Sequence, residues 1–354
     1  MKTRVLIVDD SAYTRQTIKK IIETDAGLEV VGIAADGIDA MSKALRLKPD
    51  IITLDFEMPE MDGFSFLRWL MKEQPTPVIM VSSYADSKTV FKALDLGAVD
   101  FISKPTRRAS LELQTIEKDL IRKIKGIKNI RMDILSRNLE LLENEKIVKT
   151  PKKRKNVSID VVAIGSSTGG PAALQIILTR IPADFQAALV ISQHMPRGFT
   201  GPLAERLNKL SQLRVKEAED GDQIKKGTAY ICPGGFHLAV RQKHQKLAIA
   251  LKEGKVTDKY TPSVDYMMTS VAEQYGECSL GVILTGMGND GKNGMLEIKA
   301  KGGYTIAEAE SSAVVFGMPA EAIKNGSVET VLPISEIPSE IIRVVNNPLY
   351  KGRQ

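Results

Sequence analysis

One serine stands in a short pattern that can make a hydroxyl nucleophilic. Ser167 lies in Gly165-Ser166-Ser167-Thr168-Gly169, which fits G-x-S-x-G, after an apolar run and before a helical pattern that opens at Pro171. In such a strand–turn–helix elbow the turn exposes the hydroxyl beside the free N–H groups of the helix. A glycine-rich loop that cradles a phosphate is the alternative, although no lysine follows the glycines as in a P-loop. This stretch alone leaves both possibilities open.

A histidine and an aspartate follow two other apolar runs, as Ser167 follows the first. A serine needs a base to take its proton and an acid to orient that base. Of the three histidines, His194 follows an apolar run and precedes a proline, which makes it the favoured base. His237 lies in a glycine-rich stretch and is the competitor, whereas the polar surroundings of His244 are typical of an exposed hairpin. Asp290, among glycines, is the favoured acid.

The order of these residues along the chain is informative. α/β-Hydrolases place the acid between serine and histidine, whereas here the histidine comes second and the aspartate last. The same constellation occurs on unrelated folds and is recognised by the roles of its members. The pattern therefore predicts a serine hydrolase on a winding other than the α/β-hydrolase one.

A second set of polar residues follows the apolar runs of the first hundred residues. Its members are Asp9, Asp10, Asp55, Ser82 and Lys104. Three converging carboxylates repel one another unless a cation joins them, and an all-oxygen site favours Mg²⁺. One carboxylate beside a hydroxyl, a lysine and Mg²⁺ is equipped to accept a phosphoryl group, because the cations offset its charge. All five residues at strand ends favour this interpretation over simple capping of strands.

The elements that must position these residues are apolar runs separated by stretches with helical spacing. Continuous apolar strands predict parallel sheets covered on both faces, in doubly wound α/β domains that bind ligands at the carboxyl ends of the strands. In the first domain the expected strands are 5–8, 30–34, 51–54, 78–81 and 99–102. In the larger second domain they are 161–164, 188–192, 228–232, 247–251, 280–284, 304–307 and 328–332, with an antiparallel pair near 238–240 and 247–251.

Length and charge indicate two domains and a basic connection. A chain of 354 residues is longer than a typical single domain. The net charge is −3 over residues 1–105, +8 over residues 106–157 and +1 over the remainder, so the basic excess belongs to the connection and to neither domain. We predict a first domain over 1–105, whose last helix runs on to about 125, a basic linker over 126–157, and a second domain over 158–349. A solvated tether is favoured over a nucleic-acid-binding segment.

Composition also indicates the cellular compartment of the protein. No apolar run approaches the ~20 residues that a membrane span needs, and the short apolar run at the N-terminus ends in acids, unlike a signal peptide. Cys232 and Cys278 show no metal or redox spacing. They are interpreted as buried thiols in a reducing, cytoplasmic compartment.

The first domain resembles the receiver domain of response regulators over its whole length. The resemblance implies a flavodoxin-like fold with five parallel strands, in which Asp55 is the phosphoacceptor. It also implies that Asp9 and Asp10 bind Mg²⁺ together with Asp55 and the backbone carbonyl of Glu57. The remaining implied roles are contact with the phosphoryl group for Ser82 and Lys104 and a switch aromatic for Phe101.

The second domain resembles the chemotaxis protein-glutamate methylesterase (CheB) family. The motifs that carry the resemblance are Gly165–Pro171, Gln193–Phe199, Pro233–Gly235, Thr261–Asp265, Leu284–Gly291 and Val315–Pro319. It implies that Ser167 is the nucleophile, His194 the base and Asp290 its orienting acid. Backbone N–H groups near Thr168 and Met287 would form the oxyanion hole. Asn289 stands where a small apolar residue is expected, and it could alter the loop.

Together the two resemblances imply a phosphorylation-regulated serine esterase of sensory adaptation. It would demethylate glutamate methyl esters, and deamidate glutamines, on chemotaxis receptors in the membrane, and a chemotaxis histidine kinase would phosphorylate it. The esterase would need no cofactor, and Mg²⁺ would serve the receiver alone. The alternative is a response regulator whose second domain binds a nucleotide or nucleic acid. The near-neutral charge of residues 158–354 and the lack of a basic recognition stretch argue against that alternative.

Overall fold

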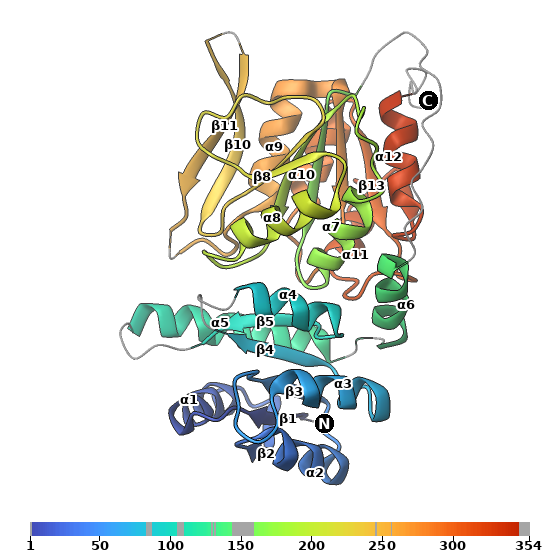
Figure 1. The fold of residues 1–354 in the computed structure, drawn as a ribbon. Helices are drawn as coiled ribbons and strands as arrows, with labels where there is room; N and C mark the ends of the chain where they lie inside the picture. The colour runs from blue at the N-terminus through green and yellow to red at the C-terminus, as the bar shows by residue number, and fades with distance from the viewer. Residues whose placement is uncertain are drawn as a thin grey trace. The chain divides into compact units, whose positions relative to one another are not determined.

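The computed structural model describes residues 2–82, 87–104, 110–128, 130, 132–143, 159–244, 246–255 and 257–346. The chain divides into two compact units, Met1–Leu139 and Glu140–Gln354. Each unit has its own parallel sheet with helices on both faces (Figure 1). The expectation of two doubly wound α/β domains is therefore confirmed.

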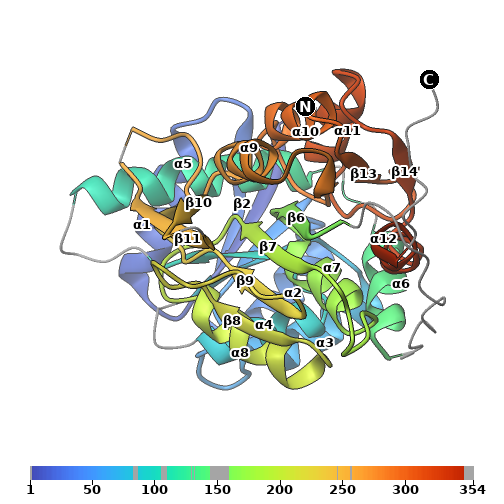
Figure 2. The ribbon, with the colours of Figure 1, turned by 90° about the horizontal axis from the view of Figure 1, so that it is seen from above.

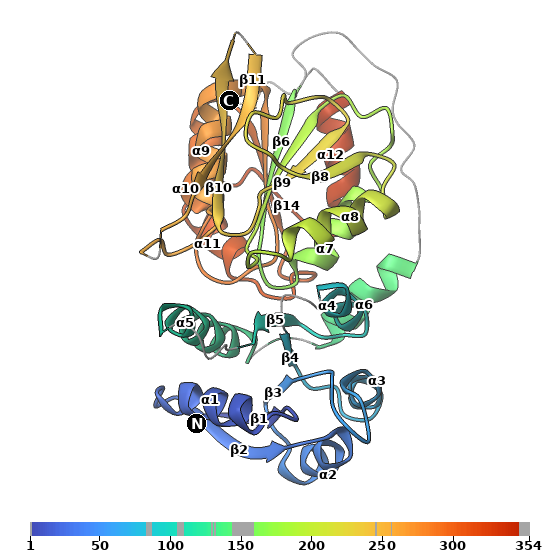
Figure 3. The same ribbon diagram turned by 60° about the vertical axis from the view of Figure 1, so that its left-hand side comes forward.

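The first unit holds a five-stranded parallel sheet in the order β2-β1-β3-β4-β5. Its strands are β1 (Thr3–Val8), β2 (Leu28–Ala34), β3 (Ile51–Leu54), β4 (Val78–Ser82) and β5 (Asp100–Ser103). Its helices are α1 (Ala12–Glu23), α2 (Gly37–Leu47), α3 (Gly63–Glu73), α4 (Ser87–Asp95) and α5 (Ser110–Ile127). Helices α1 and α5 cover one face of the sheet, and α2, α3 and α4 cover the other (Figure 3).

The second unit is built on a seven-stranded parallel sheet in the order β14-β13-β12-β6-β7-β9-β8 (Figure 2). Its strands are β6 (Val161–Ser166), β7 (Ala188–Gln193), β8 (Arg214–Glu217), β9 (Thr228–Ile231), β12 (Ser279–Ile283), β13 (Tyr304–Glu308) and β14 (Thr330–Leu332). An antiparallel pair, β10 (Phe236–Lys243) and β11 (Lys246–Glu253), forms a separate hairpin, as expected near residues 238–251.

In the described part of the second unit, six α-helices that follow β6 pack on this sheet. They are α7 (Gly170–Leu178), α8 (Thr200–Leu210), α9 (Val264–Tyr275), α10 (Lys292–Ala300), α11 (Met318–Lys324) and α12 (Ile337–Asn346). One face is covered by α7, α8 and α12, and the other by α9, α10 and α11 (Figure 3). Buried side chains of α9, among them Met267 and Val271, join the core cluster beneath the central strands. The interior strands are buried along their whole length, which explains their unbroken apolar sequence.

Strand β6 is the point at which the winding of this sheet reverses. The chain proceeds from β6 to β7, β8 and β9 on one side, and returns to β12, β13 and β14 on the other. Ligands of open α/β sheets bind beyond the carboxyl ends of the strands at such a switch point. Ser167 follows β6 directly, so the fold places it there.

Two elements were not expected from the sequence. The edge strand β8 reads Arg-Val-Lys-Glu and carries too little apolar pattern to be recognised as a strand. Helix α6 (Met132–Glu143) lies within the stretch expected to be linker. Its leucines are spaced for a helix, and the backbone carbonyl of Leu141 accepts a hydrogen bond from the guanidinium of Arg180 at 2.9 Å. The run of lysines and arginine at 152–155 lies outside the described residues.

Candidate active site

The loop between β6 and α7 distinguishes its two neighbouring serines. Ser166 ends the strand, is fully buried, and donates from its hydroxyl to Oε1 of Gln193 at 2.6 Å. Ser167 lies in the turn, before Gly169 adopts a φ of 78° and α7 begins at Gly170. A Cβ at Gly169 would approach Cβ of Val314 to 2.8 Å, so space and conformation both call for glycine there. The geometry of an elbow is therefore present, with Ser167 at its tip.

His194 and Asp290 are brought together although 96 residues separate them. His194 follows β7, Asp290 follows β12, and Nε2 of the imidazole lies 2.8 Å from Oδ2 of the carboxylate. A neutral imidazole that donates from Nε2 accepts a proton at Nδ1. Within the described residues, this buried Nδ1 has no hydrogen-bond partner. The ring of Tyr260 stacks on the imidazole, with centroids 4.9 Å apart and planes inclined by 4°.

Asp290 lies at the N-terminus of α9, where it accepts three more hydrogen bonds. Backbone N–H groups of Val264 and Asp265 donate at 2.7 and 2.9 Å, and the Ser263 hydroxyl donates at 3.1 Å. Burial favours the protonated form of this carboxyl, but the hydrogen bonds from His194 and from the helix outweigh it and lower the pKa of Asp290. The carboxylate is thus kept ionised beside the imidazole.

Asp265 makes the reciprocal contact at the start of the neighbouring helix. Its Oδ1 accepts from the backbone N–H groups of Gly291 and Gly294 at 2.9 and 2.8 Å, at the N-terminus of α10. The N-terminus of α9 is therefore bonded to an aspartate that precedes α10, and the N-terminus of α10 to an aspartate in the first turn of α9. Burial raises the pKa of Asp265 above its ordinary value.

In two peptide groups beside Ser167 the carbonyl accepts hydrogen bonds, and these bonds fix the direction of the N–H group of the same peptide. The carbonyl of Ser167 accepts from Gly170 N–H at 2.8 Å and from the Gln193 amide at 2.9 Å. In a planar trans peptide the N–H is directed opposite to the C=O. The next N–H, that of Thr168, is therefore directed away from both donors.

The second peptide follows the same rule. The carbonyl of Gly286 accepts from the N–H groups of Gly317 and Met318 at 3.1 and 2.8 Å, which turns the N–H of Met287 the other way. Gly286 packs directly on the nucleophile, because a Cβ there would lie 2.8 Å from Cβ of Ser167. The N–H groups of Thr168 and Met287 are those that the resemblance implies for an oxyanion hole, and that role stays a prediction.

A buried carboxyl, that of Glu308, is linked to the elbow through Thr285. Glu308, the last residue of β13, accepts from the N–H of Thr285 at 2.8 Å and from the hydroxyl of Ser312 at 2.9 Å. The carbonyl of Thr285 accepts from the N–H of Ser167 at 3.0 Å, and its hydroxyl donates to the carbonyl of Thr168 at 2.9 Å. Complete burial raises the pKa of Glu308 to about 7.

This raised pKa predicts a pH-dependent stability. Between pH ~4.5 and ~7 the native state binds a proton at Glu308 that the unfolded state has lost, so the free energy of unfolding falls as pH rises through that window. Glu308→Gln removes the effect. The free energy of unfolding of the variant, relative to that of wild type, should therefore rise by about 3 kcal/mol from pH 5 to pH 8. Calorimetry of the whole chain measures this, with fluorescence of Trp69, the single tryptophan, identifying the transition of the first unit.

The exposed Glu310, two residues along, provides the control for this measurement. Glu310→Gln should unfold with the pH dependence of wild type. A Glu308→Gln chain whose pH dependence equals that of Glu310→Gln would contradict the prediction.

His237 lies in a different environment from His194. Its Nδ1 accepts from the N–H of Ser263 at 3.2 Å, and its Nε2 lies 2.9 Å from Oδ2 of Asp258. Both ring nitrogens are therefore occupied, in contrast to those of His194. Through Ser263 the ring supports the segment that contacts Asp290.

The unexpected Asn289 is joined to the ring that stacks on His194. Its Oδ1 accepts from Nζ of Lys259 at 3.0 Å and from the hydroxyl of Tyr260 at 3.4 Å. Tyr260 in turn stacks on the imidazole of His194. Asn289 therefore contributes to the loop next to the histidine rather than to the carboxylate contact.

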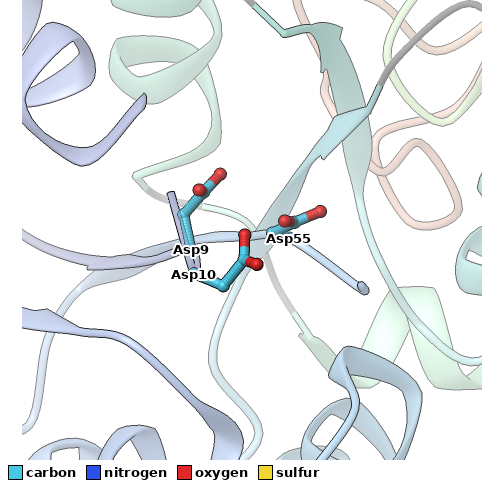
Figure 4. Close-up of side chains that lie close together, drawn as sticks. All are labelled: Asp9, Asp10 and Asp55. Carbon is cyan, nitrogen blue, oxygen red and sulfur yellow. The ribbon is translucent and has the colours of Figure 1, made fainter. Parts of the chain in front are cut away.

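In the first unit, the carboxylates that follow β1 and β3 gather at one end of the sheet. Oxygens of Asp9, Asp10 and Asp55 lie within 4.8 Å of one another (Figure 4). Nζ of Lys104 lies 2.7 Å from Oδ2 of Asp55. Burial, and then the charge of Asp55, raises the pKa of Asp9 to about 7. Among the described residues the buried Oδ2 of Asp9 has no partner, so this all-oxygen set fits a divalent cation such as Mg²⁺.

The other expected residues of this site lie on adjacent strands. Ser82 ends β4 and is fully buried, and Phe101 in β5 is 2% exposed. Nζ of the buried Lys123, on α5, lies 5.3 Å from the centroid of the Phe101 ring. Glu57 follows β3 and is exposed, and the expected role of its carbonyl stays a prediction.

Sequence reasoning overlooked several polar residues of the second unit. Gln193 and Glu308 each end an apolar strand, the position that was used to select His194 and Asp290. The same signal, a polar residue at the carboxyl end of a buried strand, could therefore have found both. Tyr260 and Asp265 lie in loop and helix-start positions, where no such signal exists.

Comparisons with known proteins agree with this architecture. Residues 162–341 match the model of the CheB methylesterase family, and residues 5–115 match that of the response regulator receiver domain. Within the parts of the chain that the structure describes, no helix is long and apolar enough to cross a membrane.

Full-length relatives are similar over both units. A protein-glutamate methylesterase/protein-glutamine glutaminase of Geobacter sulfurreducens is 44% identical, covering 97% of this chain and 97% of its own. One from Archaeoglobus fulgidus is 46% identical over 96% of this chain and 97% of its own. The crystal structure of the Thermotoga maritima CheB methylesterase catalytic domain superposes with a TM-score of 0.52 at 45% identity, covering 53% of this chain and all of that one.

Proposed function

The chain belongs to the CheB methylesterase family and carries a response regulator receiver domain, and from this premise we propose a phosphorylation-regulated serine esterase. Its substrates are γ-methyl esters of glutamate, and also glutamine side chains, on chemotaxis receptors. The observation that carries the proposal is the His194–Asp290 contact. It lies beyond the carboxyl ends of the central strands, where Ser167 is at the tip of the elbow. The names of the relatives are those of esterases and glutaminases, which favours this function over a nucleic-acid-binding module.

The proposed reaction uses groups of this chain in two steps. Oγ of Ser167 attacks the ester carbonyl, and its proton passes to Nδ1 of His194, while Asp290 stabilises the imidazolium. The N–H groups of Thr168 and Met287 donate to the oxyanion. Methoxide leaves with the proton from His194 as methanol. Water, activated by the same histidine, then hydrolyses the acyl-enzyme to glutamate, and a glutamine substrate would release ammonia instead.

The test of this function has two arms. Methylated receptor membranes should release methanol when the whole chain is added, and a serine-directed phosphonylating reagent should label Ser167 in one-to-one amount. A nucleotide- or nucleic-acid-binding module would do neither. Absence of both signals from a folded chain would refute the proposed function.

The receiver is proposed to control this activity through phosphorylation of Asp55 by a chemotaxis histidine kinase. Asp9, Asp10, Asp55 and the carbonyl of Glu57 would hold Mg²⁺, which when bound offsets the charge of a phosphoryl group. Ser82 and Lys104 would contact that group, and Phe101, as the switch aromatic, would rearrange when it is present. The Lys104–Asp55 ion pair is consistent with these roles.

Asp55→Asn should remove the response to a small phosphodonor without destroying the esterase. Allosteric coupling energies are typically ~1–3 kcal/mol, so we expect wild type to be stimulated roughly 5- to 150-fold and the variant not at all. The measurement is methanol release with and without acetyl phosphate and Mg²⁺. Asp36→Asn is a matched control, because asparagine can cap α2 as the aspartate does. Stimulation of Asp55→Asn equal to that of Asp36→Asn would overturn the assignment.

The remaining sequence-based expectations stand as parts of this proposal. The enzyme would act in the cytoplasm, on membrane receptors, and without nucleic acid as a partner. Its receiver would span 1–105, with a helix to about 125, and its catalytic domain 158–349. The linker of 126–157 would then include α6.

A further inference from the structure

Gln193 links the chain segments that carry Ser167 and His194. It is the last residue of β7, it pairs in register with Ser166 of β6, and it is 1% exposed. Its Nε2 donates to the carbonyl of Ser167 at 2.9 Å and to the carbonyl of His194 at 3.1 Å. One buried side chain thus contacts the backbone of both residues.

The orientation of this amide is determined by its neighbours. Two carbonyl oxygens lie on the Nε2 side, and they can only accept hydrogen bonds. A flipped amide would place its own oxygen against both of them and take away a donor from each, leaving the Ser167 carbonyl with the N–H of Gly170 alone. On the other side, Oε1 accepts from the hydroxyl of Ser166 at 2.6 Å. The amide is therefore fully bonded in this orientation alone.

The space around the amide is also restricted. A Cβ at Gly170 would clash with Oε1 of Gln193 and lie 2.9 Å from Cβ of Ser166. Gly170 begins α7 and its N–H donates to the same Ser167 carbonyl. The side chain of Gln193 thus explains why the second residue of the Gly169-Gly170 pair is a glycine.

Resting on the proposed esterase function, we propose that Gln193 is a positioning residue that orients the oxyanion-binding N–H of Thr168. By holding the carbonyl of Ser167 on the core side, the amide holds the N–H of the same planar peptide toward the reacting carbonyl. Donors that are fixed before the reaction lose no energy to reorientation when charge develops on the oxyanion. The effect should therefore be felt in the chemical step and not in substrate binding.

Two substitutions of Gln193 separate donation from packing. Gln193→Met retains the length of the side chain and removes both N–H donors. Gln193→Glu retains the shape and the acceptor for Ser166, but turns acceptors toward the two carbonyls. Removing an oxyanion donor outright costs about 10²–10³ in kcat, so misorienting one should cost about 10–10² in either variant. KM for methylated receptor should stay within a factor of about three, since ground-state binding is untouched.

Ser192→Ala is the matched control. Ser192 is the adjacent buried residue of β7, and within the described part of the chain its hydroxyl makes no hydrogen bond. Its removal should leave kcat unchanged. Ser166→Ala should be mild, because the two N–H bonds of Gln193 remain.

The experiment measures kcat and KM for methyl-ester release by the whole chain, together with the rate of phosphonylation of Ser167. A fall in kcat and in phosphonylation rate for both Gln193 variants, at unchanged KM, is the expected result. A folded variant with kcat within twofold of Ser192→Ala, or a loss confined to KM, would overturn the proposal. Gln193→Glu decides the matter if Gln193→Met does not fold. Failure of the proposed function is distinguishable, because wild type itself would then release no methanol and take no label.

Discussion

Ser167→Ala and His194→Ala are each expected to abolish nearly all methyl-ester hydrolysis, on the order of 10⁴–10⁶ in kcat. In the proposed mechanism the serine supplies the attacking oxygen and the histidine accepts its proton. Because these residues act as a unit, the double variant should be little worse than either single one. Methanol release from methylated receptor membranes, at enzyme concentrations high enough to detect residual rates, provides the measurement.

Two neighbouring substitutions serve as controls for this prediction. Ser166→Ala should be mild, because the Ser166 hydroxyl is buried and bonded to Gln193. His237→Gln should leave substantial activity, because both nitrogens of that ring are occupied by Ser263 and Asp258. If Ser166→Ala inactivates the enzyme and Ser167→Ala does not, the nucleophile is misassigned by one residue. Equal losses in His237→Gln and His194→Ala would overturn the choice of base.

Asp290→Asn should lower kcat by about 10²–10⁴, through misorientation of the imidazole. Each carboxylate oxygen of Asp290 accepts two hydrogen bonds, one of them from a backbone N–H of α9. In asparagine one oxygen becomes an amino group, which must face one of those N–H donors. The substitution should therefore also destabilise the second unit, by about 0.5–2 kcal/mol, the usual cost of losing a helix cap.

Asp258→Asn is the matched control, because Asp258 makes a second histidine–aspartate contact, with His237. It should retain activity close to that of wild type. The measurements are kcat and the calorimetric transition of the second unit. An Asp290→Asn enzyme within tenfold of Asp258→Asn would mean that Asp290 does not orient the base.

Much of this architecture was predictable because it depends on local patterns. Buried parallel strands must be apolar throughout, so the run Val161–Ile164 was recognisable, and a polar residue at such a strand's end stands out by contrast. The predicted pairing of His194 with Asp290 follows from that rule, and the structure brings the two side chains into contact. The edge strand β8 was not predictable, since one exposed side leaves only Val215 to show a pattern.

Other features depend on distances that no sequence pattern contains. The register of β7 against β6 decides whether the side chain of Gln193 bonds to the elbow or faces solvent. That register cannot be read from the sequence. The raised pKa of Glu308 likewise arises from complete burial, which outweighs the hydrogen bond from Thr285, a residue 23 positions away. The proposed oxyanion peptides were placed by resemblance alone, and the physical reason for their orientation emerges only from their bonded carbonyls.

The reciprocal caps of α9 and α10 bear on how this enzyme can change during evolution. Active-site residues often cost a protein stability, so that replacing them yields a sturdier but inactive molecule. Asp290 is different, because the carboxylate that contacts His194 also closes the start of a helix in the core. With the proposed role of Asp290, selection for a well-folded unit and selection for catalysis therefore favour the same residue. A lineage that no longer needs the esterase would still tend to retain its acid.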